Sequence, residues 1–213
     1  MTDLTFVPLL EKLADKLPTI ERYIVLTDAA HMPQTTLKNA VPYEDYIAES
    51  DGDFAWKSFD ENTACGMCYT SGTTGNPKGV LYSHRSNVLH AFMASLPDAK
   101  GIRACDVVMP VVPLFHANCW SLAFSTPMTG ASLVLPGPKL DGPSVLELLD
   151  TYKVTFTAGV PTVWLAMFQH EDATGKRPEH LKVATIGGSA APRSGLCGRE
   201  FESAVERVDV GGR

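Results

Sequence analysis

The 213-residue sequence lacks any run of about 18 consecutive apolar residues, which a helix needs to cross the hydrocarbon core of a membrane. Its N-terminus carries acids and has no basic stretch with a cleavage site, so no secretion signal is evident. It also lacks a block of clustered Lys and Arg, and its formal net charge is −6. Because contacts to nucleic-acid phosphates need clustered cations, nucleic acid is not expected as the main partner.

The sequence has few cysteines, and they do not form a recognisable metal-binding framework. There are 5 in total, an odd number, and most lie in apolar contexts. Cys65 and Cys68 form a CxxC pair, but no second pair exists. Their segment is typical of a buried strand, in which an offset of three places the two thiols on opposite faces. We therefore expect structural cysteines in a reduced, cytoplasmic protein.

What is present fits a globular α/β protein with a buried core. The chain is 45% hydrophobic and 20% charged. From residue 64 onward, strand-like and helix-like segments alternate with short connections, which favours a layered, mostly parallel sheet flanked by helices. Strands are expected at 64–70, 107–115, 131–136, 154–160 and 183–188, and helices from Ser83 through NVLHAFMASL and at 119–128, 144–152 and 161–172.

The chain is expected to have three parts: a connecting region at 1–63, an α/β core at 64–194 and an atypical tail at 195–213. In the first part, FVPLLEKLADKL predicts a helix and RYIVLT a strand, whereas residues 28–60 are polar and loop-like. In the tail, Gly195 and Gly198 interrupt a helical pattern, each at a cost of roughly 1 kcal/mol relative to alanine.

The most informative stretch is YTSGTTGNPKGVLYSHR, residues 69–85. A loop rich in glycine and hydroxyl side chains after a strand suits an oxyanion, because backbone N–H groups approach it closely and hydroxyls add donors. Lys78 supplies a point charge for phosphate. The segment does not match the nucleotide P-loop pattern, because Pro77 stands where its second glycine belongs and Gly79 follows the lysine.

The sequence YTSGTTGNPKGV resembles the core phosphate loop of the adenylate-forming superfamily, which includes acyl-CoA synthetases, peptide-synthetase adenylation domains and luciferases. PLFHAN at 113–118 is similar to the second core motif, and IGGSAAP at 186–192 to the strand end of the adenine pocket. The segments between them resemble the fatty-acyl-CoA synthetase branch, so the resemblance covers residues 4–194.

The resemblance implies the site residues. The loop would cradle the β- and γ-phosphates of ATP through Ser71, Gly72, Thr73, Thr74, Gly75 and Lys78, with the Thr70 hydroxyl near Mg²⁺. Adenine would lie against Gly187, Gly188, Ser189 and Ala190.

His116 would orient the acyl carboxylate, which makes it and Lys78 the candidate catalytic residues. Ala117, Gly188 and Trp120 would line the acyl site, with Trp120 at the mouth of the acyl tunnel or, equally, in a plain core position. Trp164 and Phe168 are four residues apart on a predicted helix and are expected in the core.

The family's chemistry joins a carboxylic acid to the α-phosphate of ATP, releases pyrophosphate, and then transfers the acyl group to the thiol of CoA. Mg²⁺, ATP and CoA are therefore the implied cofactor and co-substrates. The family's aromatic–Gly–x–Thr–Glu motif, ribose-binding segment and lysine-bearing small domain do not occur in this sequence. A reading-frame slip just past Ser194, or a partial sequence, is expected to explain this, and the chain alone is expected to be inactive.

The leading interpretation is thus a partial AMP-forming acyl-CoA synthetase for a medium- or long-chain fatty acid, with possible peripheral membrane contact through that substrate. A second interpretation keeps the chemistry but changes the acid to an aromatic, short-chain or sulfur-containing one. A third is a non-catalytic nucleotide-binding relict. A peptide-synthetase adenylation domain is disfavoured because no acidic residue for an amino group is identifiable.

Overall fold

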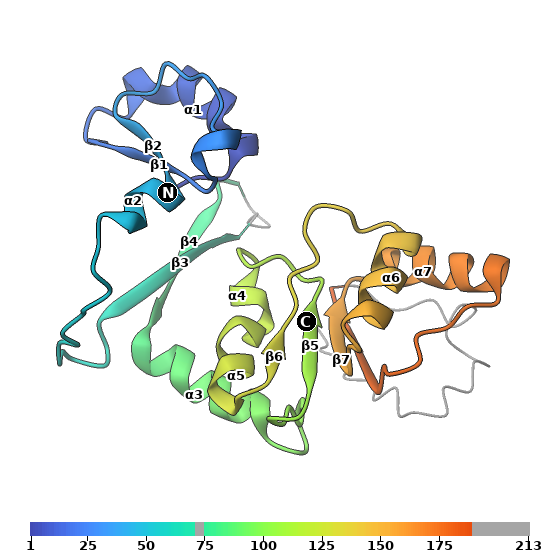
Figure 1. Cartoon of the computed structure of the whole chain (residues 1–213). Helices are drawn as coiled ribbons and strands as arrows, with labels where there is room; N and C mark the ends of the chain where they lie inside the picture. The colour runs from blue at the N-terminus through green and yellow to red at the C-terminus, as the bar shows by residue number, and fades with distance from the viewer. Residues whose placement is uncertain (71–74, 189–213) are drawn as a thin grey trace. The chain divides into compact units, whose positions relative to one another are not determined.

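The computed structural model describes residues 1–70 and 75–188, and the chain divides into two units, Met1–Ser58 and Phe59–Arg213. Figure 1 shows the order of the elements along the chain. Among the described residues, no helix combines the length and the apolar character that crossing a membrane requires.

The first unit is built on a small parallel sheet. Strand β1 (Tyr23–Val25) pairs with β2 (Ala40–Pro42), and the helices are α1 (Val7–Leu13) and α2 (Tyr43–Ala48), with single 3-10 turns at Leu4–Phe6, Ala14–Lys16 and Ala29–His31. Its core consists of Val7, Tyr23, Val25 and Leu37.

The loop-like expectation for residues 28–60 was wrong where β2 and α2 form. Both elements are too short to show a periodicity. The signal that was missed is local: Glu44 and Asp45 lie in the first turn of α2, directly after Pro42.

The second unit contains an antiparallel hairpin and a separate parallel sheet. Strand β3 (Ala64–Thr70) pairs with β4 (Lys78–Ser83). The four-stranded sheet has the order β6-β5-β7-β8, with β5 at Val107–Pro110, β6 at Ser132–Leu133, β7 at Phe156–Gly159 and β8 at Val183–Ile186. Its helices are α3 (His84–Ser95), α5 (Leu122–Thr129), α6 (Gly142–Thr151) and α7 (Pro161–Thr174). The short element α4 (Ala117–Trp120) has a left-handed backbone and is a turn rather than an ordinary α-helix.

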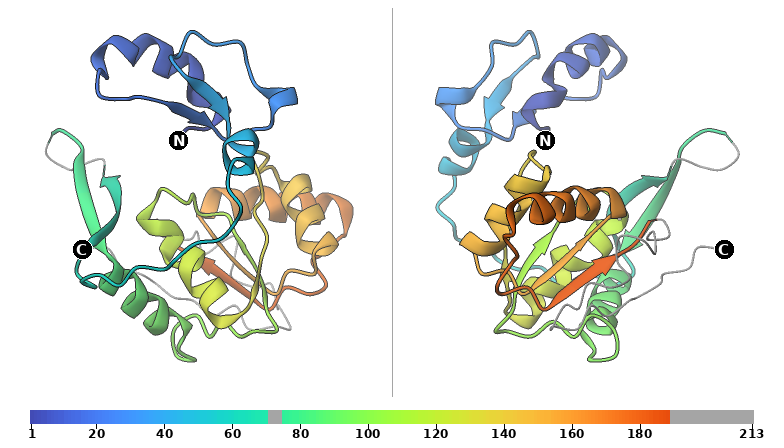
Figure 2. Two further views of the ribbon diagram at one scale, coloured as in Figure 1. Left: turned by 60° about the vertical axis from the view of Figure 1, so that its left-hand side comes forward. Right: turned by 90° about the vertical axis from the view of Figure 1, so that its right-hand side faces the viewer.

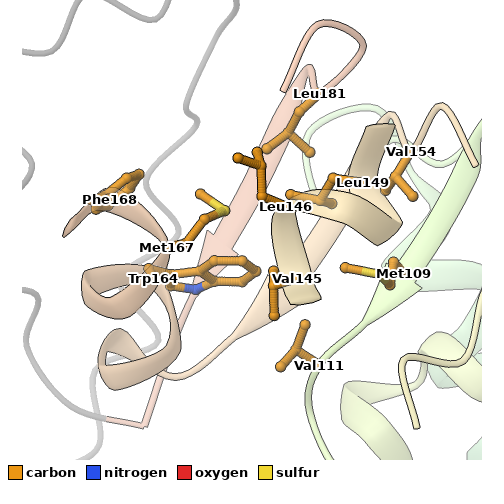
Figure 3. Close-up of a cluster of buried hydrophobic side chains, with 10 residues drawn as sticks. All are labelled: Met109, Val111, Val145, Leu146, Leu149, Val154, Trp164, Met167, Phe168 and Leu181. Carbon is orange, nitrogen blue, oxygen red and sulfur yellow. The ribbon is translucent and has the colours of Figure 1, made fainter. Parts of the chain in front are cut away.

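Helices cover both faces of the four-stranded sheet, which confirms the expected α/β class. Successive residues of β5 point to opposite faces. Met109 joins a core cluster with residues of α6 and α7, whereas Val108 joins one with Leu122 of α5. Figure 2 shows α6 and α7 on one side of the strands, and Figure 3 shows the first cluster with Trp164 and Phe168 in it. These two residues are 1% and 6% exposed, so the core prediction for them is confirmed.

Local signals fix the helix ends in this unit. The Ser83 hydroxyl accepts from the Ser86 N–H (3.1 Å) and the Ser86 hydroxyl accepts from the Ser83 N–H (3.0 Å), a reciprocal cap that begins α3 as predicted. Helix α6 begins after Asp141, whose carboxylate accepts from the Ser144 N–H.

Two element boundaries differ from the prediction. The strand expected over 107–115 ends at Pro110, because the N–H groups of Val111 and Val112 both turn to the Ala158 carbonyl (2.8 and 3.2 Å). The helix expected over 119–128 begins only at Leu122, because the residues before it have left-handed backbone conformations.

Candidate functional site

Three loops meet at one edge of the parallel sheet. Strands β5, β7 and β8 are adjacent and parallel, so their carboxyl ends lie at the same edge. Residues 111–121 follow β5, Val160 follows β7, and Gly187 follows β8. Ligands of open α/β sheets bind outside the carboxyl ends of the strands. This edge is therefore the candidate site.

A left-handed turn follows His116 at this edge. Residues 117–121 all have positive φ, from 45° at Ala117 to 71° at Ser121. Each L-residue in this conformation costs roughly 1–2 kcal/mol, and asparagine, which stands at position 118, tolerates it best. Strain of this kind persists only where surrounding contacts hold it, and it is often found at functional sites.

The turn places the Trp120 indole directly against Gly187. A methyl group added at Gly187 would lie 2.6 Å from the Trp120 Cη2 atom. Gly187 is buried, and its N–H donates to the Gly159 carbonyl (3.3 Å). Any side chain at position 187 would therefore force the Trp120 indole to move. Trp120, predicted for the acyl site, and Gly187, predicted for the adenine pocket, are thus in contact.

Lys100 and Cys119 each form a hydrogen bond that holds the left-handed turn. The Lys100 ammonium donates to the Trp120 carbonyl (2.9 Å), and the Cys119 thiol donates to the Val112 carbonyl (3.0 Å). Burial lowers the pKa of Lys100. Burial raises the pKa of Cys119 to about 11, against the opposing effect of the Lys100 charge, so this thiol is protonated at neutral pH.

The glycine loop closes the β3–β4 hairpin. Thr70 ends β3, Lys78 begins β4, and the two are paired across the hairpin. Both side chains are exposed, and Lys78 forms no salt bridge with another described residue. Gly75 has φ of +132°, a conformation open to glycine. Lys78 is therefore available to an anion at the loop.

Apart from Thr70, Gly75 and Lys78 at the hairpin, the predicted site residues fall into three groups. Ser71, Gly72, Thr73, Thr74, Ser189 and Ala190 lie outside the described residues. Trp120 and Gly187 are brought together, with Gly188 next in the chain at φ of +88°. His116 is exposed immediately before the left-handed turn and Ala117 lies within it, whereas no hydrogen bond or salt bridge between described residues joins His116 to Thr70 or Lys78.

The expectation that Cys65 and Cys68 lie on opposite strand faces was wrong. A β-bulge falls between Ala64 and Gly66, so Cys65 is an extra residue without a partner on β4. An inserted residue breaks the alternation of faces. Both thiols consequently reach one hydrogen-bonded pair of side chains, Asn87 and Asn118. Cys65 forms a hydrogen bond with Asn87, and Cys68 forms one with Asn118. Both cysteines are free thiols.

The described residues do not form a magnesium site by themselves. None of their His, Cys, Asp and Glu side chains gather in a group of three or more that could hold a metal. Mg²⁺ prefers octahedral oxygen coordination that includes one or two carboxylates. Thr70 offers a single hydroxyl, which falls short of the carboxylate coordination that the ion prefers.

Sequence reasoning missed Lys100 and Asn87. Asn87 lies two residues after the glycine-loop stretch and Lys100 lies after α3, but neither belongs to a recognised site motif, and only the folded chain brings them to the turn. The one available signal was the asparagine at 118, a residue type favoured in left-handed turns.

Comparison with known proteins points to one family. A model of the family described as AMP-binding enzyme matches residues 3–206. The match continues past Ser194, where the resemblance was expected to end.

Three curated relatives are ligases. The chain is 43% identical over 210 residues to a 3-methylmercaptopropionyl-CoA ligase of Ruegeria lacuscaerulensis, covering 99% of this chain and 39% of the relative. It is 41% identical to a medium-chain-fatty-acid–CoA ligase of Ectopseudomonas oleovorans (94% and 36%) and 46% identical to a long-chain-fatty-acid–CoA ligase of Thermus thermophilus (90% and 34%). The chain thus spans less than two fifths of the length of each of these relatives.

A solved structure shares the fold. The anthranilate CoA ligase AuaEII, in complex with anthranoyl-AMP, aligns with a TM-score of 0.76 at 22% identity, covering 96% of this chain and 39% of that one.

Proposed function

Since this chain belongs to the AMP-binding enzyme family, we propose that its protein is an AMP-forming acyl-CoA synthetase for a medium- or long-chain fatty acid. In the proposed reaction a carboxylate oxygen attacks the α-phosphorus of ATP and the bond to pyrophosphate breaks. The CoA thiolate then attacks the acyl carbonyl carbon, the bond from that carbon to the adenylate oxygen breaks, and AMP leaves. The relatives named as medium-chain and long-chain fatty-acid CoA ligases support this interpretation.

The observation that carries the proposal is the contact between Trp120 and Gly187 at the carboxyl edge of the sheet. An acyl-adenylate joins an apolar chain to a nucleotide, so its two ends need adjacent subsites. In the proposal Trp120 lines the acyl side, and the segment Gly187–Gly188 lines the adenine side. In the same proposal His116, exposed directly before the turn, orients the carboxylate, and Lys78 binds the phosphates at the glycine loop.

A second candidate acid rests on one specific observation. A relative at 43% identity is named for 3-methylmercaptopropionate, a short sulfur-containing acid. Its identity to this chain lies between those of the medium- and long-chain ligases, so sequence similarity does not separate the acids. The chemistry proposed for His116 and Lys78 is the same for both acids.

We further propose a cytoplasmic location, with peripheral membrane contact through the fatty acid.

We also propose that the 213-residue chain alone binds nucleotide and acyl groups but does not complete turnover, because it spans 39% of the length of a relative. Incubation with ATP, Mg²⁺, CoA and dodecanoate, followed by mass spectrometry, should yield no dodecanoyl-CoA. Formation of the thioester would overturn the claim of incomplete turnover.

The binding experiment uses isothermal titration with ATP on Lys78→Ala and on a matched control. Lys182→Ala removes another exposed lysine of the same unit, beside β8. We expect Lys78→Ala to weaken ATP binding about tenfold or more, since hydrogen bonds to charged groups contribute roughly 1.5–3 kcal/mol. Lys182→Ala should bind like the original chain. Equal affinity in all three proteins would remove Lys78 from the site.

The acid is identified with non-hydrolysable acyl-sulfamoyl-adenosines carrying dodecanoyl, 3-(methylthio)propanoyl or benzoyl groups. Preference for dodecanoyl supports the fatty-acid proposal, and preference for the sulfur-containing group supports the second candidate. Preference for benzoyl would contradict both.

A further inference from the structure

A continuous chain of side-chain hydrogen bonds links the hairpin, helix α3 and the left-handed turn. The Asn87 amide donates to the Cys65 sulfur (2.9 Å), and the Asn118 amide donates to the Asn87 carbonyl oxygen (3.1 Å). The Cys68 thiol donates to the Asn118 carbonyl oxygen (3.4 Å). The Cys65 thiol in turn donates to the Tyr82 carbonyl (3.3 Å). We call Cys65, Asn87, Asn118 and Cys68 the clasp.

One orientation of each amide satisfies the whole clasp. Asn87 and Asn118 each donate through nitrogen and accept through oxygen, so the bonds run in one direction without conflict. Asn87 and Cys68 are each 9% exposed. A buried amide that loses its partner pays its full desolvation cost, so the members of such a network depend on one another.

The clasp depends on the bulge in β3. Because Cys65 is the extra residue of the bulge, its sulfur reaches the same network as the Cys68 sulfur. Without the bulge, residues three apart would face opposite ways. Strand β3 is therefore held to α3 and to the turn at two points rather than one.

The clasp joins the two halves of the candidate site. Strand β3 ends at Thr70, directly before the glycine loop. Asn118 lies two residues after His116 and two before Trp120, inside the left-handed turn. A displacement of the loop strand therefore acts on Asn118 through hydrogen bonds, and a displacement of the turn acts on the strand in the same way.

We propose that Asn118 is a positioning residue, which through the clasp couples the strand of the glycine loop to the turn that carries His116 and Trp120. Occupation of the loop by nucleotide then favours the turn conformation that receives the acyl group, and the reverse holds equally, since coupling between two sites is reciprocal. The ligand part of this inference, that nucleotide and acyl group affect each other's binding, rests on the proposed function. The mechanical part, that Asn118 links the loop strand to the turn, rests on the clasp alone.

The mechanical part is tested by thiol reactivity. We treat the 213-residue chain with iodoacetamide and follow each cysteine by peptide mass mapping. In Asn118→Gly the backbone keeps access to positive φ, but the amide is lost. We expect Cys68 to alkylate roughly fivefold faster or more, because a net hydrogen bond contributes about 1 kcal/mol. Cys105, which is exposed, should keep its rate in the same sample.

Two further variants separate the hydrogen bond from general loosening. Asn39 is another asparagine at positive φ, 54°, in the first unit, so Asn39→Gly is the matched control and should leave Cys68 unchanged. Asn118→Asp keeps an oxygen that accepts from Cys68 and loses only the donor to Asn87, so Cys68 should alkylate more slowly in this variant than in Asn118→Gly. If Cys68 reacts equally fast in Asn118→Gly and the original chain, the clasp is refuted. If Asn118→Asp exposes Cys68 as Asn118→Gly does, the hydrogen bond is not the cause.

The ligand part is tested by measuring dodecanoate affinity with and without a non-hydrolysable ATP analogue. In the original chain the analogue should tighten dodecanoate binding about fivefold or more, and in Asn118→Gly this factor should fall toward one. An unchanged factor, together with exposed Cys68, would overturn the coupling and leave the clasp as a structural contact. If neither ligand binds to the original chain, the proposal that this chain alone binds nucleotide and acyl groups fails, whereas the thiol result still decides the clasp.

Discussion

Individual residues at the carboxyl edge of the sheet owe their properties to burial. Cys119 is fully buried in the left-handed turn, and its thiol is protonated well above neutral pH because a thiolate there is not solvated. Burial has the opposite effect on Lys100: it lowers the pKa of this side chain, because the charged form of lysine is the protonated one. The two groups therefore change the stability of the fold with pH in opposite directions.

For Cys119 the folded pKa is raised above the unfolded value near 9, to about 11. The protonated Cys119 thiol contributes to the free energy of unfolding. This contribution is fully present below pH 9 and is lost as the pH rises through about 11. Two pKa units correspond to at most about 3 kcal/mol. We expect Cys119→Ala to remove this part of the pH dependence, as measured by urea unfolding of both chains below pH 9 and near pH 11.

The difference in stability between Cys119→Ala and the original chain isolates the Cys119 thiol, because all other groups that titrate in this pH range are the same in both proteins. The alanine variant also loses the thiol bond to the Val112 carbonyl, but that loss is independent of pH below the thiol's titration. A parallel fall in the stability of both chains between the two pH values would mean that the Cys119 thiol does not titrate with a raised pKa.

At the scale of elements, close helix packing depends on positions where no side chain fits. Helices α6 and α7 cover one face of the sheet, and Gly142 at the start of α6 lies against α7. A methyl group at Gly142 would lie 2.3 Å from the Ala166 carbonyl oxygen, which is a backbone atom and cannot rotate away. The two helices would have to separate.

We therefore expect Gly142→Ala to lower the free energy of unfolding by roughly 1–3 kcal/mol, the usual cost of overpacking. Gly66→Ala is the control, because a methyl group there meets no atom within 4 Å. Chemical denaturation followed by circular dichroism measures both variants. Equal stability of Gly142→Ala and Gly66→Ala would show that α6 and α7 adjust without cost.

Helix α3 shows how an amphipathic pattern can be present while its apolar side stays uncovered. Val88, Phe92 and Leu96 recur at helical spacing, yet they are 50%, 59% and 56% exposed. The buried positions of the helix are Asn87, Ala91 and Ala94 instead. The spacing predicted the helix correctly, but the buried polar residue Asn87 belongs to the clasp, while the large apolar side chains are exposed.

At the scale of the whole molecule, the core is divided. One cluster of buried apolar residues, which includes Val25 and Leu37, belongs to the first unit, and two clusters belong to the second. Each cluster stabilises the hydrogen bonds of its own elements, so the two units need not open together.

We expect Leu37→Ala to cost about 2–5 kcal/mol locally, the usual range for a buried leucine. Amide hydrogen exchange should then rise in β1 and β2 and stay unchanged in β5 and β7. Leu149→Ala in the second unit is the matched substitution and should give the opposite pattern. Faster exchange in both units from either substitution would show that they unfold as one.

The sequence alone determined those features of the fold that depend on residues close together along the chain. The position of strand β3, the cap of α3, the helices after Asp141 and Pro161, and the fold class were all predictable, because caps, prolines and hydrophobic periodicities act within a few positions along the chain. The expectation that β3 is buried was wrong, since Cys68 is its single buried residue. The glycine-loop motif carried the family resemblance in the same way. Short elements such as β2 and α2 escaped, because three to six residues hold too little periodicity.

The tertiary structure decided what depends on residues far apart in sequence. The clasp joins pairs separated by 22, 31 and 50 positions, and the bulge that brings Cys65 into it is set by pairing with β4. The left-handed turn persists because Lys100 and Asn87 hold it from outside. Propensity makes such a turn costly for L-residues, and only contacts formed in the folded chain offset that cost, which is why Trp120 comes to lie on Gly187.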